Sequence, residues 1–277
     1  MHVLSIVGHS DTGKTTLTER LTDRFSDRGR VGTVKHIDCE PTLDTEGKDT
    51  ARHRAAGAVQ TYGIGDDEWF ATGDTSELDL HEALERLGER CDYALVEGYS
   101  DLALPTVVLG EYDVDRGEVL ARPSHGEEAD IEAIVDALEA TEPYETLSSL
   151  VAKVKRSPDE VYSGAIATFT GRVRAKEGPD DERTEKLEFE KYDEVAEQKM
   201  AEIREELEKR DGVYEVRMHH KTGVVEAGED IVFVVVLAGH RGEAFETVED
   251  GINRLKEIVP LFKKEVTVDE EFWAHEQ

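Results

Sequence analysis

The sequence predicts an α/β domain with a mostly parallel sheet, followed by a second domain of the α+β class. The chain has 277 residues, enough for two domains that each bury a core. Its first half alternates short apolar runs with helical patterns, which is typical of parallel strands covered by helices. Its second half contains IVFVVVL, Ile231 to Leu237, an apolar run that indicates a buried central strand.

The elements of the first half follow in a regular order. We expect strands at Val3 to Val7, Val31 to Lys35, Tyr93 to Glu97 and Thr106 to Leu109, with a helix at Thr15 to Arg28. Between Gly126 and Pro143, apolar residues at helical spacing predict a closing helix. The first domain is therefore expected to span residues 1–142 and the second residues 143–277.

The second half has a different rhythm. Helices are expected at Leu147 to Lys155, at Val195 to Leu207 and after Gly242, and strands at Ala165 to Thr170, Leu187 to Tyr192, Val213 to His220 and Ile231 to Leu237. Strands and helices in this irregular alternation predict an α+β arrangement.

The charge restricts the partners. Asp and Glu total 64 against 33 Lys and Arg, for a net charge of -31. This excess repels phosphate backbones and anionic lipid surfaces, so we expect no nucleic-acid or membrane binding. The spread of acidity suits a high-salt cytoplasm, and the N-terminus has no signal-peptide pattern. Cys39 and Cys91 form no CxxC pair, so neither a disulfide framework nor a zinc site is expected.

A phosphate-binding motif joins the first strand to the first helix. GHSDTGKTT, Gly8 to Thr16, matches the GxxxxGK[ST] pattern without a mismatch. Its backbone N–H groups and the helix N-terminus are suited to bind phosphates, with Lys14 at the terminal phosphates and Thr15 on magnesium. The predicted nucleotide-binding residues are Gly8, Asp11, Thr12, Gly13, Lys14, Thr15 and Thr16.

Two further features accompany this motif. Glu97 ends an apolar strand, where a magnesium-binding acid belongs, so Thr15 and Glu97 are the predicted metal ligands. The charged stretch from Lys35 to Ala58 is either a solvated helix or a site for a second anionic ligand. No NKxD-type stretch identifies the base.

The first 110 residues resemble the MobB family of molybdopterin guanine dinucleotide synthesis. The resemblance rests on the P-loop, on VKH at Val34 to His36, on Asp44 to Ala58 and on VEGYS from Val96. It implies binding of GTP with Mg²⁺, weak GTP hydrolysis and cooperation with a molybdenum cofactor guanylyltransferase. The alternative is a P-loop metabolite kinase in which Arg52 and Arg54 form a phosphate lid.

Cations in the acidic second half are expected to gather around one strand end. GHRG follows the IVFVVVL strand, and an Arg at a helix N-terminus is unfavourable unless an anion binds there, so His240 and Arg241 are candidate phosphate ligands. Lys256 lies within about 20° of Phe245, on the expected apolar face of the next helix. There it either extends its ammonium group to solvent along the apolar surface or serves as a base or nucleophile. Pro260 ends that helix and returns Lys263 toward the same site.

This half resembles the MoaE family, the catalytic subunit of molybdopterin synthase, with its α/β hammerhead fold. The matching motifs are GAIATFTGRVR at Gly164 to Arg174, Gly228 to Glu246, and LKEIVPLFKKE at Leu255 to Glu265. The resemblance implies sulfur transfer to cyclic pyranopterin monophosphate from the Gly-Gly thiocarboxylate of a small MoaD-like β-grasp carrier.

By position, the MoaE resemblance also assigns residues and partners. It implies catalytic roles for Lys256 and Lys263, and substrate-binding roles for Arg174, His240 and Arg241. Lys264 is expected to point elsewhere and to tolerate change. Relatives of both halves imply a homodimer. The alternative is a non-catalytic scaffold that binds anions and a β-grasp protein.

Overall fold

The computed structural model describes residues 1–37, 47–100, 102–176, 178–179, 182–191, 193–267 and 271–274, with the backbone alone at 190–191, 193–194, 261–263, 265, 267 and 271–274. Cys39 and Asp44, which the sequence singled out, lie outside these ranges. The chain forms two compact units, Met1–Tyr144 and Glu145–Gln277.

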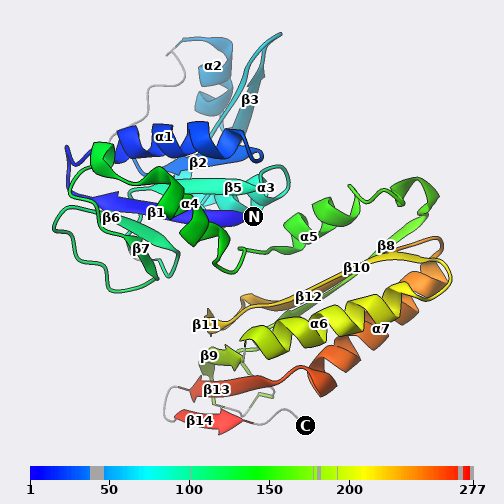
Figure 1. The fold of residues 1–277 in the computed structure, drawn as a ribbon. Coiled ribbons are helices and arrows are strands. Elements are labelled where there is room, and N and C mark those ends of the chain that lie inside the picture. The colour runs from blue at the N-terminus through cyan, green and yellow to red at the C-terminus, as the bar shows by residue number, and fades with distance from the viewer. Residues whose placement is uncertain are drawn as a thin grey trace. The chain divides into compact units, whose positions relative to one another are not determined.

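The first unit is built on a five-stranded sheet. Its strands are β1 (His2–Gly8), β2 (Val31–Lys35), β5 (Tyr93–Glu97), β6 (Thr106–Leu109) and β7 (Val119–Ala121). Their order is β2-β5-β1-β6-β7, and all neighbours are parallel (Figure 1). The predicted parallel sheet is confirmed. Since β1 is central and the chain crosses to either side of it, the carboxyl end of β1 is a switch point where ligands bind in open α/β sheets.

Helices and a hairpin complete this unit. The helices are α1 (Lys14–Ser26), α2 (Asp49–Ala55), α3 (Leu80–Gly88) and α4 (Ile131–Glu139), with short 3-10 turns at Thr75–Glu77 and Gly126–Glu128. Strands β3 (Gln60–Ile64) and β4 (Trp69–Gly73) pair only with each other among the described strands. On α1, Leu17, Leu21 and Phe25 recur at helical spacing and are fully buried against the sheet. This packing fixes α1, and with it the phosphate-binding loop at its N-terminus.

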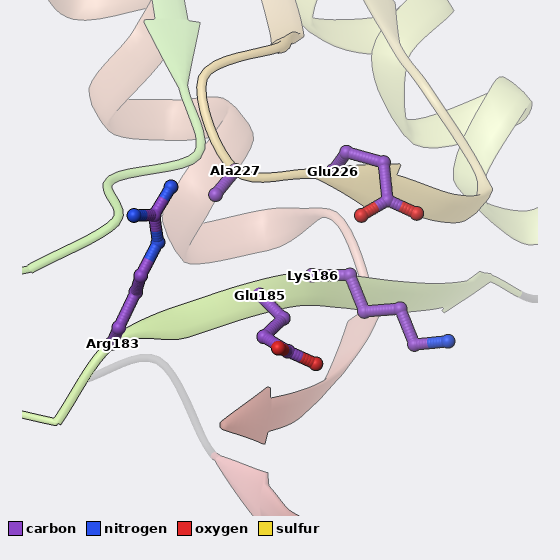
Figure 2. Close-up of a pocket in the computed structure, with 5 residues that line it drawn as sticks. All are labelled: Arg183, Glu185, Lys186, Glu226 and Ala227. Carbon is purple, nitrogen blue, oxygen red and sulfur yellow. The ribbon is translucent and has the colours of Figure 1, made fainter. Parts of the chain in front are cut away.

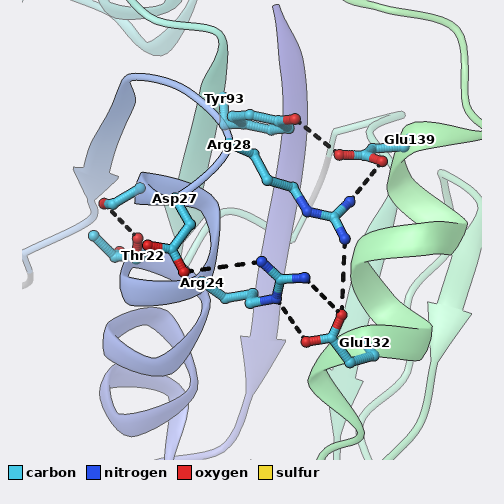
Figure 3. Close-up of polar contacts among 8 residues, drawn as sticks. Thr22, Arg24, Asp27, Arg28, Tyr93, Glu132 and Glu139 are labelled. Carbon is cyan, nitrogen blue, oxygen red and sulfur yellow. Dashed lines mark hydrogen bonds and ion pairs between the residues drawn. The ribbon is translucent and has the colours of Figure 1, made fainter.

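Ion pairs fasten α1 to α4 (Figure 3). Arg24 Nε lies 2.6 Å from Glu132 Oε1, and Arg28 Nη1 lies 2.7 Å from Glu139 Oε2. The Tyr93 hydroxyl donates to Glu139 Oε1 at 2.8 Å. Hydrogen bonds from Arg28 and Tyr93 lower the pKa of the Glu139 carboxyl, and burial together with Glu139 raises the pKa of Tyr93. These ion pairs stabilise the C-terminal end of α1, away from the phosphate-binding loop.

The second unit contains two antiparallel sheets. Its strands are β8 (Ala165–Arg172), β9 (Thr184–Lys191), β10 (Val213–His220), β11 (Gly223–Glu226), β12 (Asp230–Ala238), β13 (Leu261–Thr267) and β14 (Glu271–Ala274), and its helices are α5 (Leu147–Val154), α6 (Asp193–Glu208) and α7 (Arg241–Ile258), with a 3-10 turn at Glu160–Tyr162. The sheet orders are β10-β12-β8 and β11-β9-β13-β14. The predicted α+β class is confirmed.

Strand β12 is central, as its apolar run predicted. Val232, Val234 and Val236 pack with α6 and α7, whereas Phe233, Val235 and Leu237 pack with α5. Both faces of the three-stranded sheet are therefore covered, so every position of the strand from Val232 to Ala238 is buried and the sequence shows no alternation there.

Helix α7 buries most of the expected face, but not its edge. Val248, Ile252 and Leu255 are buried as predicted, whereas Phe245 is 65% exposed. The buried stripe also includes Ala244, Thr247 and Gly251. Because Lys256 shares the line of Phe245, the expectation that Lys256 lies on the apolar face is wrong, and Lys256 is exposed to solvent.

Arg254 of α7 joins this helix to α6. Its Nη1 lies 2.7 Å from Oε2 of Glu206 on α6, and its Nε lies 3.0 Å from Oδ2 of Asp250, one turn earlier on α7. Arg210 also pairs with Asp250. Burial opposes the charge of Asp250, but hydrogen bonds from the two arginines outweigh it, so its pKa is lowered.

Among the helices that the structure describes, none combines the length and the hydropathy that a membrane span requires.

Candidate functional site

The loop after β1 forms an anion-binding cradle. Gly13 is the N-cap of α1 with φ 82°, a left-handed conformation that glycine adopts without strain. Among the described side chains, none caps this N-terminus, and the first turn has no acidic residue. The first N–H groups of α1 and the positive end of its dipole therefore remain available to an anion. These features fit a bound phosphate.

Lys14 lies along the same loop. Its Nζ donates to the carbonyl oxygens of Gly8 at 2.8 Å and of His9 at 2.6 Å. The Thr12 hydroxyl donates to the carbonyl of His9 at 2.8 Å. The ammonium group is thus held at the mouth of the cradle, where it adds a positive charge beside the backbone donors.

The two predicted metal ligands come together. Glu97 ends β5 and is 6% exposed, and the Thr15 hydroxyl donates to its Oε1 at 3.2 Å. A hydroxyl and a carboxylate on neighbouring elements suit Mg²⁺, which takes few protein ligands and keeps several waters. In the described part of the chain, no group of three or more His, Cys, Asp or Glu side chains is arranged to hold a metal. Magnesium at Thr15 and Glu97 would therefore depend on phosphate and water for its other ligands.

A supporting segment that the sequence did not reveal lies behind the cradle. The Gly126 N–H donates to the Thr12 carbonyl at 2.9 Å, and Arg20 donates to the carbonyl of Gly126 at 2.6 Å. A Cβ on Gly126 would lie 2.1 Å from the Gly13 oxygen, so only glycine allows this approach. A Cβ on Gly13 would in turn lie 2.6 Å from the His125 ring. More than a hundred residues separate these partners, and no local pattern marks such a contact.

The second unit presents cations at the N-terminus of α7. His240 is the N-cap residue, Arg241 is the first residue of the helix, and both are exposed. No described side chain caps this helix. The helix N-terminus that the sequence predicted at this position is confirmed, and its N–H groups and two basic side chains face solvent together.

Lys256 lies at the opposite end of the same helix. It follows Arg241 by fifteen positions, which in an α-helix corresponds to about 22 Å along the axis. The expectation that all the cations gather at one strand end is therefore wrong for a single chain. The sequence pattern could not show this, because two motifs that follow each other along the chain lie at opposite ends of the helix that joins them.

Arg174 belongs to the Lys256 end. Helix α7 begins just after Ala238 and runs back across β12 (Figure 1), so its last turn lies toward Asp230. Strand β8 pairs with β12 so that Arg172 is opposite Asp230. Arg174 comes two residues later and is exposed. One end of this sheet thus has Arg174 and Lys256, and the other has His240 and Arg241.

The structure describes the side chain of Lys264 but only the backbone of its neighbour Lys263. Lys263 lies opposite Phe189 of β9 and Ala274 of β14 in the strand register, and its side chain is outside the described part of the structure. Lys264 Nζ lies 3.9 Å from Glu188 Oε2. Lys264 is therefore engaged in a loose ion pair on its own sheet.

An open hollow of about 610 Å³ borders the Arg174 segment (Figure 2). It is lined by Arg183, Glu185, Lys186, Glu226 and Ala227. The Thr184 N–H donates to the Ala175 carbonyl at 2.9 Å, and the Gly228 N–H donates to the Val173 carbonyl at 2.8 Å. These bonds fix the backbone on both sides of Arg174 beside the hollow, whose lining combines cations with carboxylates.

Comparison with known proteins finds a known family for each unit. The family model for Molybdopterin guanine dinucleotide synthesis protein B, MobB, matches residues 3–136, and the model for MoaE protein matches residues 140–258. A Haloferax volcanii protein named probable molybdopterin synthase is 52% identical over 278 residues, covering 100% of both chains. The chain belongs to the molybdopterin synthase family. It joins a MobB domain to a MoaE domain, and its function lies in molybdenum cofactor biosynthesis.

Relatives of each half are also found separately. The molybdopterin synthase catalytic subunit of Bacillus subtilis strain 168 is 35% identical over 143 residues, 52% of this chain and 87% of that one. The crystal structure of Bacillus subtilis MobB covers 51% of this chain and 100% of that chain, with 25% identity and a TM-score of 0.42. The two predicted resemblances and the enzymatic class are confirmed.

Proposed function

We propose that the MoaE domain transfers sulfur from the C-terminal Gly-Gly thiocarboxylate of a MoaD-like β-grasp carrier to cyclic pyranopterin monophosphate. The observation that carries this proposal is the uncapped, doubly basic N-terminus of α7. His240 and Arg241 are suited to bind the substrate phosphate, and Arg174 adds a cation near the other end of the sheet. In each transfer, a C–O bond to the oxygen of water replaces the C–S bond of the carrier, which becomes a carboxylate, and on the substrate a C–S bond replaces a carbon–oxygen bond.

Lys256 and Lys263 are the proposed catalytic residues. The reaction brings together two anions, the thiocarboxylate and the phosphate, so ammonium groups favour their approach. Sulfur transfer also requires proton movement, which a lysine amine can perform when it touches the reacting atoms. Lys256 is exposed at the last turn of α7.

The length of α7 supports a homodimer. One small substrate cannot touch Arg241 and Lys256 of the same chain, because about 22 Å of helix separates them. Two copies related by a twofold axis can place the N-terminus of α7 of one copy beside the Lys256 end of the other. We therefore propose that each active site combines Arg174, Lys256 and Lys263 of one copy with His240 and Arg241 of the second.

For the MobB domain, we propose binding of GTP with Mg²⁺, weak hydrolysis, and assistance to a molybdenum cofactor guanylyltransferase. The loop Gly8 to Thr16 would hold the phosphates, and Thr15 and Glu97 would hold the metal. Magnesium held there would neutralise the charge of the phosphate oxygens. The net charge of -31 supports a high-salt cytoplasm as the setting for both domains, since screening reduces self-repulsion.

Reconstitution tests the central proposal. The purified full chain, the thiocarboxylated carrier and cyclic pyranopterin monophosphate are mixed in high salt, and molybdopterin is measured after oxidation to its fluorescent derivative. We expect product with the thiocarboxylated carrier and none with the same carrier ending in a carboxylate. Absence of product with a folded chain would overturn the proposal. Binding of fluorescent GTP and ATP analogues, each with Mg²⁺, tests the nucleotide assignment, and tighter ATP binding would contradict it.

A further inference from the structure

The ammonium group of Lys35 lies between the two residues suited to hold magnesium. Its Nζ is 2.9 Å from Glu97 Oε1 and donates to Thr15 Oγ1 at 3.2 Å. The same Thr15 hydroxyl donates to Glu97. A single cation therefore already touches both oxygens that a divalent metal at this site would need.

The strand register explains why Lys35 reaches this position. Lys35 is the last residue of β2 and Glu97 the last of β5, and these residues are direct partners in the parallel pairing. Both side chains therefore leave the sheet at the same edge. The P-loop helix α1 starts at that edge, and Thr15 is its second residue.

The two partners differ in their freedom to move. The Glu97 side chain is 8% exposed, so an uncompensated negative charge there is costly, whereas the Lys35 side chain is 52% exposed. A lysine ammonium is a mobile point charge on a flexible stem, and it loses little by returning to water. Lys35 can leave the site at low cost, but Glu97 needs a cation whenever Lys35 does so.

We propose that Lys35 is a displaceable counter-ion that competes with Mg²⁺ for Glu97 and Thr15. The inference rests on the proposed nucleotide binding by the MobB domain. Without a divalent ion, the ammonium neutralises Glu97 and allows a nucleotide phosphate to approach it. When magnesium enters with the nucleotide, Lys35 releases both oxygens. By linkage, the lysine weakens the dependence of nucleotide affinity on magnesium.

The test compares nucleotide affinity with and without the metal. The dissociation constant of a fluorescent, non-hydrolysable GTP analogue is measured on the full chain in excess Mg²⁺ and in excess EDTA. The ratio of the EDTA value to the Mg²⁺ value is the magnesium coupling. We expect Lys35→Met to raise this ratio by about fivefold or more, mainly through weaker binding in EDTA. Lys35→Gln serves as a second variant if Lys35→Met does not melt cooperatively.

Two controls separate this effect from general loss of charge. Arg30→Met removes one positive charge just before β2, at the strand end away from Glu97, and should leave the ratio unchanged. In a Glu97→Gln background, Lys35→Met should have no further effect, because the shared ligand is gone. Direct Mn²⁺ binding without nucleotide, followed by electron paramagnetic resonance, should become tighter in Lys35→Met.

The outcomes distinguish the two proposals. If the wild-type chain binds the analogue but Lys35→Met leaves the ratio and Mn²⁺ affinity unchanged, Lys35 is a static ion-pair partner and the inference is overturned. A lower ratio in Lys35→Met contradicts it equally, since the lysine would then assist the metal. If the wild-type chain binds no analogue in either condition, the nucleotide-binding proposal fails and this inference fails with it.

Discussion

The two candidate sites of this chain are assembled in opposite ways. In the MobB domain, one continuous loop and the end of an adjacent strand bring Thr15 into contact with Glu97 and hold Lys14 against the Gly8 carbonyl. In the MoaE domain, His240 and Lys256 are at opposite ends of α7. The first site is therefore largely complete in a single chain, whereas the second, as we propose it, needs two.

The difference lies in what each ligand requires. A phosphate chain binds to consecutive backbone N–H groups, which a short loop before a helix can supply. A reaction between a carrier terminus and a small substrate needs cations on several sides of the reacting atoms. A helix of eighteen residues cannot place both of its ends on one small molecule.

The largest expected effect separates the two domains. We expect Lys256→Ala to lower molybdopterin formation by about 10²-fold or more, because a group that moves a proton at the reacting atoms is lost. Nucleotide binding by the MobB domain should stay unchanged, as should binding of the carrier. Synthesis assays, fluorescence titration and carrier pull-down measure the three quantities. Retained synthesis would favour the non-catalytic scaffold.

Mixing two inactive variants tests the composite site. If the proposed arrangement is correct, Lys256→Ala and Arg241→Ala chains, unfolded and refolded together, should form mixed dimers that each contain one intact site. Random pairing then restores about a quarter of wild-type synthesis. Each variant refolded alone is the control. Mixed samples no more active than the controls would mean that both residues act within one copy, or independently of each other.

The adjacent lysines of β13 sharpen the assignment of the catalytic residues. Lys263→Ala is expected to reduce synthesis at least about tenfold, as loss of a catalytic ammonium would. Lys264→Ala should have little effect, since the pair of Lys264 with Glu188 is loose, at 3.9 Å, and lies on its own sheet. Initial rates of both variants under identical conditions provide the comparison. Equal losses would count against a specific role for Lys263.

A change of Gly13 tests the single-chain site. Gly13→Ala forces a left-handed residue at φ 82° and places a Cβ 2.6 Å from the His125 ring. The conformation alone costs about 1–2 kcal/mol, so we expect a lower melting temperature of the first unit and weaker nucleotide binding. Gly57→Ala is the control, because it is also left-handed but has no atom within 4 Å of its Cβ. Equal loss of nucleotide binding in both variants would show that strain, and not the cradle, is responsible.

The smallest expected effect concerns pH. Hydrogen bonds from Arg24 lower the pKa of Glu132, and those from Arg28 and Tyr93 lower that of Glu139, relative to the ordinary value of 4.5. Their stabilising contribution is present above that value and is lost as the pH falls through the lowered pKa of the folded state. Arg28→Met should flatten this acid dependence in thermal melts at low salt. High salt should reduce the difference in acid dependence between Arg28→Met and the wild-type chain.

Most elements could be predicted because their signals are local. The P-loop, the central strand β12 and the helix start at Arg241 each follow from a few adjacent residues. At the edge of the buried stripe of α7 the prediction was wrong, because Phe245 is apolar yet exposed and Thr247 is polar yet buried. Periodicity counts apolar side chains, whereas burial depends on the sheet and the helix that pack against α7.

The order of the residues is enough to identify the chemical groups of this protein: a phosphate loop, an acid at a strand end, and cations retained in a chain of charge -31. Tertiary structure alone decided which of these groups meet. Parallel register places Lys35 beside Glu97, and the contact of Gly126 with Gly13 closes the cradle across more than a hundred residues. The straight rise of α7 separates Arg241 from Lys256. Residue identity sets what a group can do, but only the path of the backbone sets the distances over which charges and hydrogen bonds act.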